Sequence, residues 1–197
     1  MGKYLIDVPD DFNLKFEKGI DSQPGEINGK IFGFGYDYGA YSDTLIMSQN
    51  EYINKGWWKD RAIMVYVYSK NPSVNWVKTK VINYKPSTRQ DSAFAGGCDF
   101  VANCSYEAFH FKLPIFILGE IKDHIVKIDS VQHYYRRLVY PRKGKKGLIG
   151  VYMRKRESDI TTDTLYSAMV IDVKNLVGKQ QDLALEILTT LRPKPKN

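Results

Sequence analysis

The sequence has no apolar run long enough to cross a lipid bilayer. Its most apolar stretches, residues 113–118 and 165–173, fall well short of the ~20 residues that a membrane-spanning helix needs. The N-terminal residues also lack the apolar core of a secretory signal peptide. We therefore expect no transmembrane segment. The N-terminus is equally compatible with a mature chain from which a leader has been removed.

Motifs of the common enzyme and cofactor-binding families are missing as well. The glycine-rich stretch 33–39 misses the spacing of a dinucleotide-binding loop by one residue, and no P-loop, nucleophile elbow or zinc-protease motif occurs. The three histidines, His110, His124 and His133, have no second metal ligand at short spacing, so we interpret them as surface or strand residues. We predict no catalytic residue, no metal and no cofactor. The alternative is a hydrolase whose site gathers scattered carboxylates or histidines.

Cysteine is scarce, and the two that occur, Cys98 and Cys104, have five residues between them. This is not the spacing of a thioredoxin-like or zinc site. A hairpin that turned at residues 99–103 would bring the pair close enough for a disulfide, which would indicate an oxidising compartment. Two buried thiols are the alternative. A nucleophilic cysteine would need a basic partner such as His110, and we favour it least.

The composition is that of a folded globular protein. Hydrophobic residues make up 43% of the chain and charged residues 26%, and a chain of 197 residues suits a single domain with a substantial core. No internal repeat or low-complexity linker marks a boundary, so we expect one domain over residues 1–197. The 14 tyrosines favour half-buried sheet faces, because the ring packs while the hydroxyl stays hydrated.

Alternation of apolar and polar residues predicts mostly strands, joined in several places by hairpins. A strong hairpin signal is the glycine- and lysine-rich turn at residues 144–147, between the strands predicted at 131–140 and 148–155. Residues 19–29 are rich in turn formers and are predicted to be turns. The predicted strands cover residues 10–16, 30–38, 62–68, 74–84, 94–98, 104–111, 121–128, 131–140, 148–155 and 163–173.

Two helices are predicted. Ser48 and Glu51 have the spacing of a capping box, so a short helix is expected to start there and to end before Gly56. Residues 180–191 carry apolar side chains on one stripe and are followed by Pro193, which predicts an amphipathic helix. Strands outnumber helices, and the predicted class is α+β with a mainly antiparallel sheet.

Short motifs at both ends of the chain carry a resemblance. They lie at residues 8–12, 18–22, 25–27, 36–42, 150–152 and 184–192. In this arrangement the chain resembles the PsbP-like and Mog-like superfamily of bacterial secreted or lipid-anchored proteins. The resemblance implies a curved antiparallel sheet flanked by helices and ending in a C-terminal helix. It also implies an extracytoplasmic location and a binding, assembly or chaperone-like role, with no shared catalytic residues to carry over.

Positive charge is concentrated in one segment, residues 131–156, which contains no Asp or Glu. The remaining 20 of the 29 basic residues are outnumbered by the 22 acidic ones, so this segment accounts for the whole net charge of +7. Concentrated charge creates a field that attracts anions. The nine candidate binding residues are Arg136, Arg137, Arg142, Lys143, Lys145, Lys146, Arg154, Lys155 and Arg156.

Aromatic residues are interleaved with these charges, namely Tyr134, Tyr135, Tyr140 and Tyr152. Charge and rings together suit an acidic protein partner, an anionic membrane surface or single-stranded nucleic acid. Nucleic acid is disfavoured, because no recognised binding module surrounds the segment. The other interpretation is a solvated hairpin whose charges protect an edge strand, with alternation dividing them between two faces. We predict a non-enzymatic binding or assembly module whose partner is another protein. The alternative is a protein that binds nucleic acid or an anionic surface through the basic hairpin 131–156.

Overall fold

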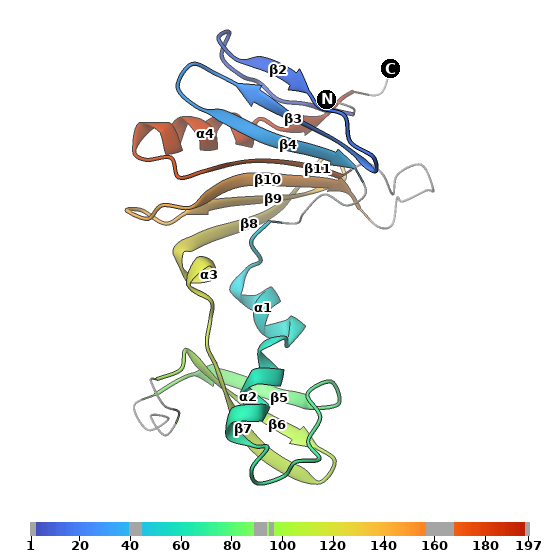
Figure 1. Ribbon diagram of the computed structural model, residues 1–197, viewed down its shortest axis with the longest axis vertical. Coiled ribbons are helices and arrows are strands. Elements are labelled where there is room, and N and C mark those ends of the chain that lie inside the picture. Colours follow the sequence, from blue (N-terminus) through green and yellow to red (C-terminus); the bar gives the residue numbers. More distant parts are fainter. Residues whose placement is uncertain (1–2, 40–44, 89–93, 95–96, 157–167, 196–197) are drawn as a thin grey trace. The chain divides into compact units, whose positions relative to one another are not determined.

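The computed structural model describes residues 3–39, 45–88, 94, 97–156 and 168–195 (Figure 1). These residues form four helices and twelve strands, and every strand pair is antiparallel. The predicted α+β class with a mainly antiparallel sheet is confirmed. None of the helices within the described ranges has the length and apolarity of a membrane span.

The contacts of the chain divide it into two compact units. Unit 1 comprises Met1–Met47 and Glu120–Asn197, and unit 2 comprises Ser48–Gly119, so unit 2 is an insertion in the sequence of unit 1. Insertions of this kind need no low-complexity linker, which is why the sequence shows no boundary. That residues 1–197 unfold together as a single domain stays a prediction.

Unit 1 is built on an open seven-stranded sheet. Its order is β2 (Asn13–Phe16), β3 (Ser22–Asn28), β4 (Gly33–Gly39), β11 (Ala168–Lys174), β10 (Leu148–Lys155), β9 (Tyr134–Pro141) and β8 (His124–Val131). The strand predicted at 163–173 is confirmed over its described part, because β11 lies centrally between β4 and β10. Residues 157–167 lie outside the described residues.

β3 corrects the prediction that residues 19–29 are turns. Pro24 and Gly25 discourage a strand assignment from sequence, yet Pro24 pairs with Asp37 of β4 and Gly25 with Tyr36. A glycine is required at position 25, because a Cβ there would lie 2.4 Å from the Tyr36 hydroxyl oxygen. Tertiary packing therefore overrides the local turn preference.

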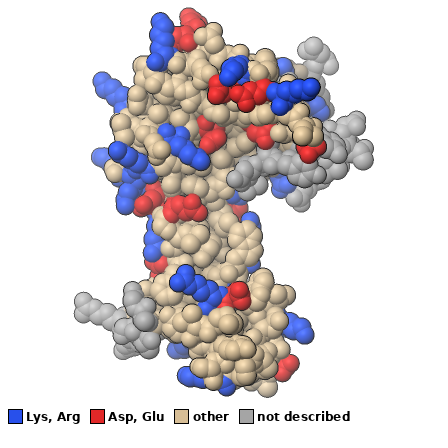
Figure 2. Space-filling view, viewed as in Figure 1, with Lys and Arg blue, Asp and Glu red and all other residues tan. Residues whose placement is uncertain are grey.

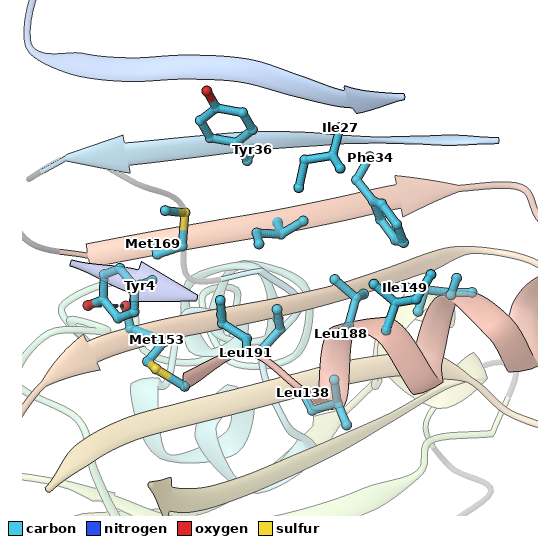
Figure 3. Packing of buried hydrophobic residues seen from close by; sticks show 14 of the residues in the cluster. Tyr4, Ile27, Phe34, Tyr36, Leu138, Ile149, Met153, Met169, Leu188 and Leu191 are labelled. Atoms are coloured by element: carbon cyan, nitrogen blue, oxygen red, sulfur yellow. Dashed lines mark hydrogen bonds between the residues drawn. The ribbon is translucent and has the colours of Figure 1, made fainter. Parts of the chain in front are cut away.

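One face of this sheet carries the main core. Cross-strand pairing aligns Tyr36, Ile171, Val151 and Leu138 in one row, and all four are buried in the same cluster. Helix α4 (Lys179–Thr189) contacts β10 and β9. Figure 3 shows its Leu188 among the side chains that the sheet contributes, and both α4 and these strands add residues to the cluster.

The two ends of unit 1 are tied together. β1 (Tyr4–Leu5) pairs with β12 (Arg192–Pro193), and the two guanidinium NH groups of Arg192 donate to the Asp7 carboxylate at 2.7 and 2.9 Å. This contact holds the pKa of the Asp7 carboxyl below its ordinary value.

Unit 2 combines two helices with a three-stranded sheet in the order β5 (Lys80–Pro86), β6 (Phe100–Tyr106) and β7 (Phe109–Ile115). Helix α1 (Gln49–Lys55) begins at the predicted capping box, with Ser48 and Glu51 reciprocally hydrogen-bonded, and ends at Gly56. This prediction is confirmed. The short helix α3 (Gly119–Asp123) starts at the boundary between the units. It takes the first part of the strand predicted at 121–128, and β8 confirms the rest.

Helix α2 (Trp58–Tyr66) contradicts the strand predicted at residues 62–68. The run is rich in β-branched and aromatic residues, which favour strands in general. Its buried positions, however, are Trp58, Ala62 and Ile63, a helical spacing that buries one stripe against β7. The prediction failed because the apolar residues occupy both the buried and the exposed side of the helix.

Candidate functional site

The hairpin predicted around the glycine- and lysine-rich turn is confirmed, with β9 and β10 as its strands. Strand alternation divides the nine candidate cations between different surroundings. Arg136 pairs with Met153 and lies on the core face, whereas Arg137 pairs with Tyr152 and lies on the opposite face. The nine cations therefore do not form one patch.

Arg136 has a structural role. Its guanidinium donates to both carboxylate oxygens of Asp129, at 2.9 and 2.6 Å, and to the Thr189 carbonyl oxygen at 2.9 Å. These bonds join β8, β9 and the end of α4. The two bonds from Arg136 to Asp129 also hold the pKa of the Asp129 carboxyl below its ordinary value, because its charged form accepts them.

On the opposite face, Arg137 and Arg154 pack with Tyr135. Arg137 is 6% exposed, and its Nε donates to the Tyr135 hydroxyl at 3.1 Å. The Arg154 guanidinium carbon lies 5.7 Å from the centre of the same ring. The remaining strand cations lie at the end of β10, where Lys155 is the last residue and Arg156 donates to the Ser130 hydroxyl.

The interleaved tyrosines are also engaged within the fold. Tyr134 packs edge-on against Tyr4, Tyr135 against Tyr152, and Tyr140 lies under the Lys127 ammonium. Tyr152 itself is buried. These rings therefore give less support to a role in stacking nucleic-acid bases than the sequence suggested.

The other four cations lie between β9 and β10 in residues 142–146, which we call the basic turn. Its backbone is held by neighbouring elements: the Arg142 N–H donates to the Asp123 carbonyl oxygen at 2.8 Å, and the Gln181 amide of α4 donates to the Lys145 carbonyl oxygen at 3.1 Å. The Arg142 Nε donates to the Lys122 carbonyl oxygen at 2.8 Å. Gly144 closes the turn with a φ of 79°, a conformation that favours glycine.

His124 fixes the far end of the basic turn. Its Nε2 accepts the Leu148 N–H at 3.0 Å, so the proton of the neutral ring lies on Nδ1, which donates to the Glu120 carbonyl oxygen at 2.6 Å. Gly147 leaves room for this ring, because a Cβ at that position would lie 2.3 Å from Nε2. The neutral imidazole is thus a fixed part of the scaffold.

The basic turn borders a cavity of about 650 Å³, which we call the basic cavity. Its apolar wall is supplied by the end of β9, the start of β10 and the region of α4, and its cationic rim by the basic turn. Figure 2 shows Lys and Arg side chains gathered at the left-hand end of the sheet, where this turn lies in Figure 1. The apolar residues are Tyr140, Pro141, Ile149, Val177 and Leu185.

Two of the four cations are available to a ligand. Lys145 is paired with the Asp123 carboxylate at 2.9 Å, and Arg142 donates to a backbone carbonyl. Lys143 and Lys146 are exposed and make no hydrogen bond or ion pair within the described part of the chain. The arrangement can therefore attract an anionic group to the rim of an apolar cavity.

The expected disulfide between Cys98 and Cys104 is wrong, because the two sulfurs are not bonded to each other. Cys104 lies within β6 and Cys98 precedes the same strand, while the hairpin turn comes later, at Glu107 with a φ of 52°. β6 carries the chain from Phe100 to Cys104 in one direction, so the two cysteines are not brought opposite each other as a disulfide requires.

Cys104 is also a poor nucleophile. Burial raises the pKa of its thiol to about 11, although the Lys59 charge opposes this. The register of β6 and β7 pairs Cys104 with Phe111 and Ser105 with His110, so Cys104 and His110 point to opposite faces. Across the described ranges, no group of three His, Cys, Asp or Glu side chains is arranged to hold a metal ion.

Several residues around the basic turn were missed from the sequence. Ile149 and Leu185 line the basic cavity, and His124 bonds the start of β10; none of them carries a local motif, and only the fold brings them beside the basic turn. Comparison with known proteins adds no assignment: no family model, curated protein or solved structure matches the chain.

Proposed function

We propose that this protein is a non-enzymatic binding or assembly module that binds an acidic segment of another protein at the basic cavity. The observation that carries the proposal is the hydrogen-bonded backbone of the basic turn. It presents Lys143 and Lys146, which have no partner among the described residues, beside an apolar wall. Complementary charge would steer the partner, and apolar burial would supply affinity.

The anchoring of the turn favours binding over a purely protective role. Charges that only protect a strand edge need no fixed backbone. Here hydrogen bonds to Asp123 of α3 and Gln181 of α4 hold the turn itself, and His124 of β8 holds Leu148 just after it. A loop fixed in advance loses little conformational freedom on binding, which lowers the cost of association.

The proposal includes the architecture and location that the resemblance implies. A PsbP-like or Mog-like protein would have a curved antiparallel sheet flanked by helices, a C-terminal helix and an extracytoplasmic site in a bacterium. The seven-stranded antiparallel sheet and the position of α4 near the C-terminus support it. The location rests on the resemblance alone, because the disulfide that would have indicated an oxidising compartment is not formed.

The test measures fluorescence anisotropy of three labelled probes with the intact protein. The probes are a peptide of alternating acidic and leucine residues, vesicles with one-third anionic lipid, and a single-stranded oligonucleotide. We expect the peptide to bind most tightly and its affinity to fall as salt rises. The double variant Lys143→Glu, Lys146→Glu is expected to lose at least tenfold in peptide affinity.

The matched control is Lys80→Glu, Lys85→Glu, which makes the same change in net charge at two exposed positions of β5. It is expected to bind the peptide like the unaltered protein. If both double variants lose affinity equally, net charge and not the basic cavity is responsible, and the proposal fails. Tighter binding to vesicles or oligonucleotide than to the peptide would overturn the choice of a protein partner.

A further inference from the structure

Unit 2 contains a second cavity, of about 450 Å³, with a different chemistry. Helix α2 forms one side, and the end of β7 with the residues that follow forms another. The size lies in the range of small-molecule sites. Its lining is apolar or aromatic except for one arginine: Tyr52, Trp58, Arg61, Ala62, Val65, Tyr66, Pro114, Phe116 and Leu118.

Apolar side chains at this cavity are exposed to an unusual degree. Val65 is 62% exposed, Leu118 47% and Phe116 42%, although all three line the same hollow. Single exposed apolar residues are normal on a protein surface, but a group of them around a cavity marks a binding site. Trp58, in contrast, is buried, and its indole N–H donates to the Ile53 carbonyl oxygen at 3.0 Å, which fixes the position of this ring in the lining.

Arg61 is the only charged residue among the described residues of the lining. Its side chain is exposed, and the guanidinium makes no ion pair or hydrogen bond with any residue that the structure describes. A guanidinium matches the two oxygens of a carboxylate and forms its strongest hydrogen bonds with such a group. Charge complementarity therefore favours a ligand with an anionic group beside Arg61, and the apolar lining favours a ligand whose remaining part is apolar.

We propose that this cavity binds an apolar carboxylate, with the carboxyl group at Arg61 and the hydrocarbon or aromatic part beside Trp58. The inference concerns unit 2 alone and does not depend on the function proposed for the basic cavity. The same chemistry is offered by a free aromatic or aliphatic acid and by the C-terminal carboxylate of a peptide that ends in apolar residues.

The experiment is a titration of the intact, ¹⁵N-labelled protein, followed by NMR of its three tryptophan indole N–H groups. The probes are 4-phenylbutanoate and 4-phenylbutan-1-ol, which share a carbon skeleton and differ in charge. We expect the acid to shift the Trp58 signal and to bind about tenfold more tightly than the alcohol. Trp57 and Trp76 do not line the cavity and serve as internal references.

Arg61→Gln is expected to weaken binding of the acid about tenfold and to leave binding of the alcohol unchanged. Lys78→Gln removes one exposed charge elsewhere in unit 2 and should change neither. The proposal is overturned if acid and alcohol bind equally, if Arg61→Gln has no effect on the acid, or if the three indole signals shift alike.

A second arm distinguishes the two sources of the carboxylate. A pentapeptide ending in Leu-Phe is compared with its C-terminal amide and with 4-phenylbutanoate. Tighter binding of the free-acid peptide than of 4-phenylbutanoate, with loss on amidation, supports a peptide C-terminus. The reverse order supports a small acid. Equal binding of peptide and amide, together with no binding of 4-phenylbutanoate, contradicts the proposal.

Discussion

At the scale of single residues, the contact between Gly147 and His124 couples the basic turn to the rest of unit 1. The imidazole bonds backbone groups on both sides, at Glu120 and at Leu148. The position of the ring depends on the missing Cβ at residue 147, so a single methyl group tests the arrangement.

Gly147→Ala is expected to lower the free energy of unfolding by about 1–3 kcal/mol, because the ring must move and its hydrogen bonds weaken. Urea unfolding followed by far-UV circular dichroism measures this. Gly119→Ala is the control, because nothing lies within 4 Å of the added Cβ. An unfolding curve for Gly147→Ala that overlays that of Gly119→Ala would contradict the packing described.

The Asp129 carboxyl links stability to pH. Its pKa in the folded protein lies below the ordinary value of 3.8, because Arg136 bonds its charged form. A depressed pKa stabilises the fold above the unfolded-state pKa, and this contribution is lost as pH falls through the folded-state pKa. The carboxylate is half exposed, so we expect an effect below about 1 kcal/mol.

Asp129→Asn should therefore reduce the loss of unfolding free energy between pH 6 and pH 3. The measurement is a set of urea titrations at several pH values, with Asp10→Asn as a control at an exposed aspartate of unit 1. A variant Asp129→Asn whose pH dependence equals that of the unaltered protein would show that the Arg136 contact does not contribute.

At the scale of elements, the end of α3 partly neutralises the positive charge of the basic turn. Asp123 neutralises Lys145 at a distance of 2.9 Å, so only part of the charge of the turn is available to an anion. Asp123→Asn would leave the carbonyl contact to Arg142 in place and release Lys145.

We expect Asp123→Asn to raise the affinity for the acidic peptide about two- to fivefold at low salt. At higher salt the increase should be smaller, because salt screens the charges. Anisotropy titrations at two salt concentrations measure it. Asp182→Asn, which removes the acidic residue that lines the cavity, offers a comparison at a different position. Unchanged or weaker binding by Asp123→Asn would mean that the Lys145 charge does not contribute to the site.

Helices and strands could be predicted where a local sequence pattern is compatible with only one kind of structure. The capping box at Ser48 and the glycine-rich turn between β9 and β10 define their elements by chemistry within a few residues. α2 was predicted as a strand. Apolar residues lie on both its buried and its exposed side, so the sequence shows a continuous apolar run like that of a strand. The hairpin turn near the cysteines was predicted at residues 99–103, but it lies at Glu107. The sequence did not indicate it, because no glycine or proline marks this turn.

At the scale of the whole molecule, the main buried cluster and the tryptophans belong to different units. The main cluster of unit 1 contains no residue of unit 2. All three tryptophans, Trp57, Trp58 and Trp76, lie in unit 2, whereas the seven-stranded sheet lies in unit 1. Tryptophan fluorescence and far-UV circular dichroism therefore report mainly on different units.

We expect the two signals to give different urea midpoints, because each unit can unfold while the other remains folded. Leu188→Ala empties a fully buried position of α4 and should lower the stability of unit 1 by about 2–5 kcal/mol. It should shift the circular dichroism transition and leave the fluorescence transition in place. Coincident transitions in both proteins would instead support the single domain expected for residues 1–197.

The sequence by itself determined the α+β class, the antiparallel pairing around the basic turn and the concentration of charge in residues 131–156. These follow from periodicity, turn chemistry and composition, which act over short distances along the chain. Only the tertiary structure decided which charges remain available, because packing places Asp129 against Arg136 and Asp123 against Lys145. The two cavities were also decided there, since each is lined by residues far apart in sequence that only packing brings together.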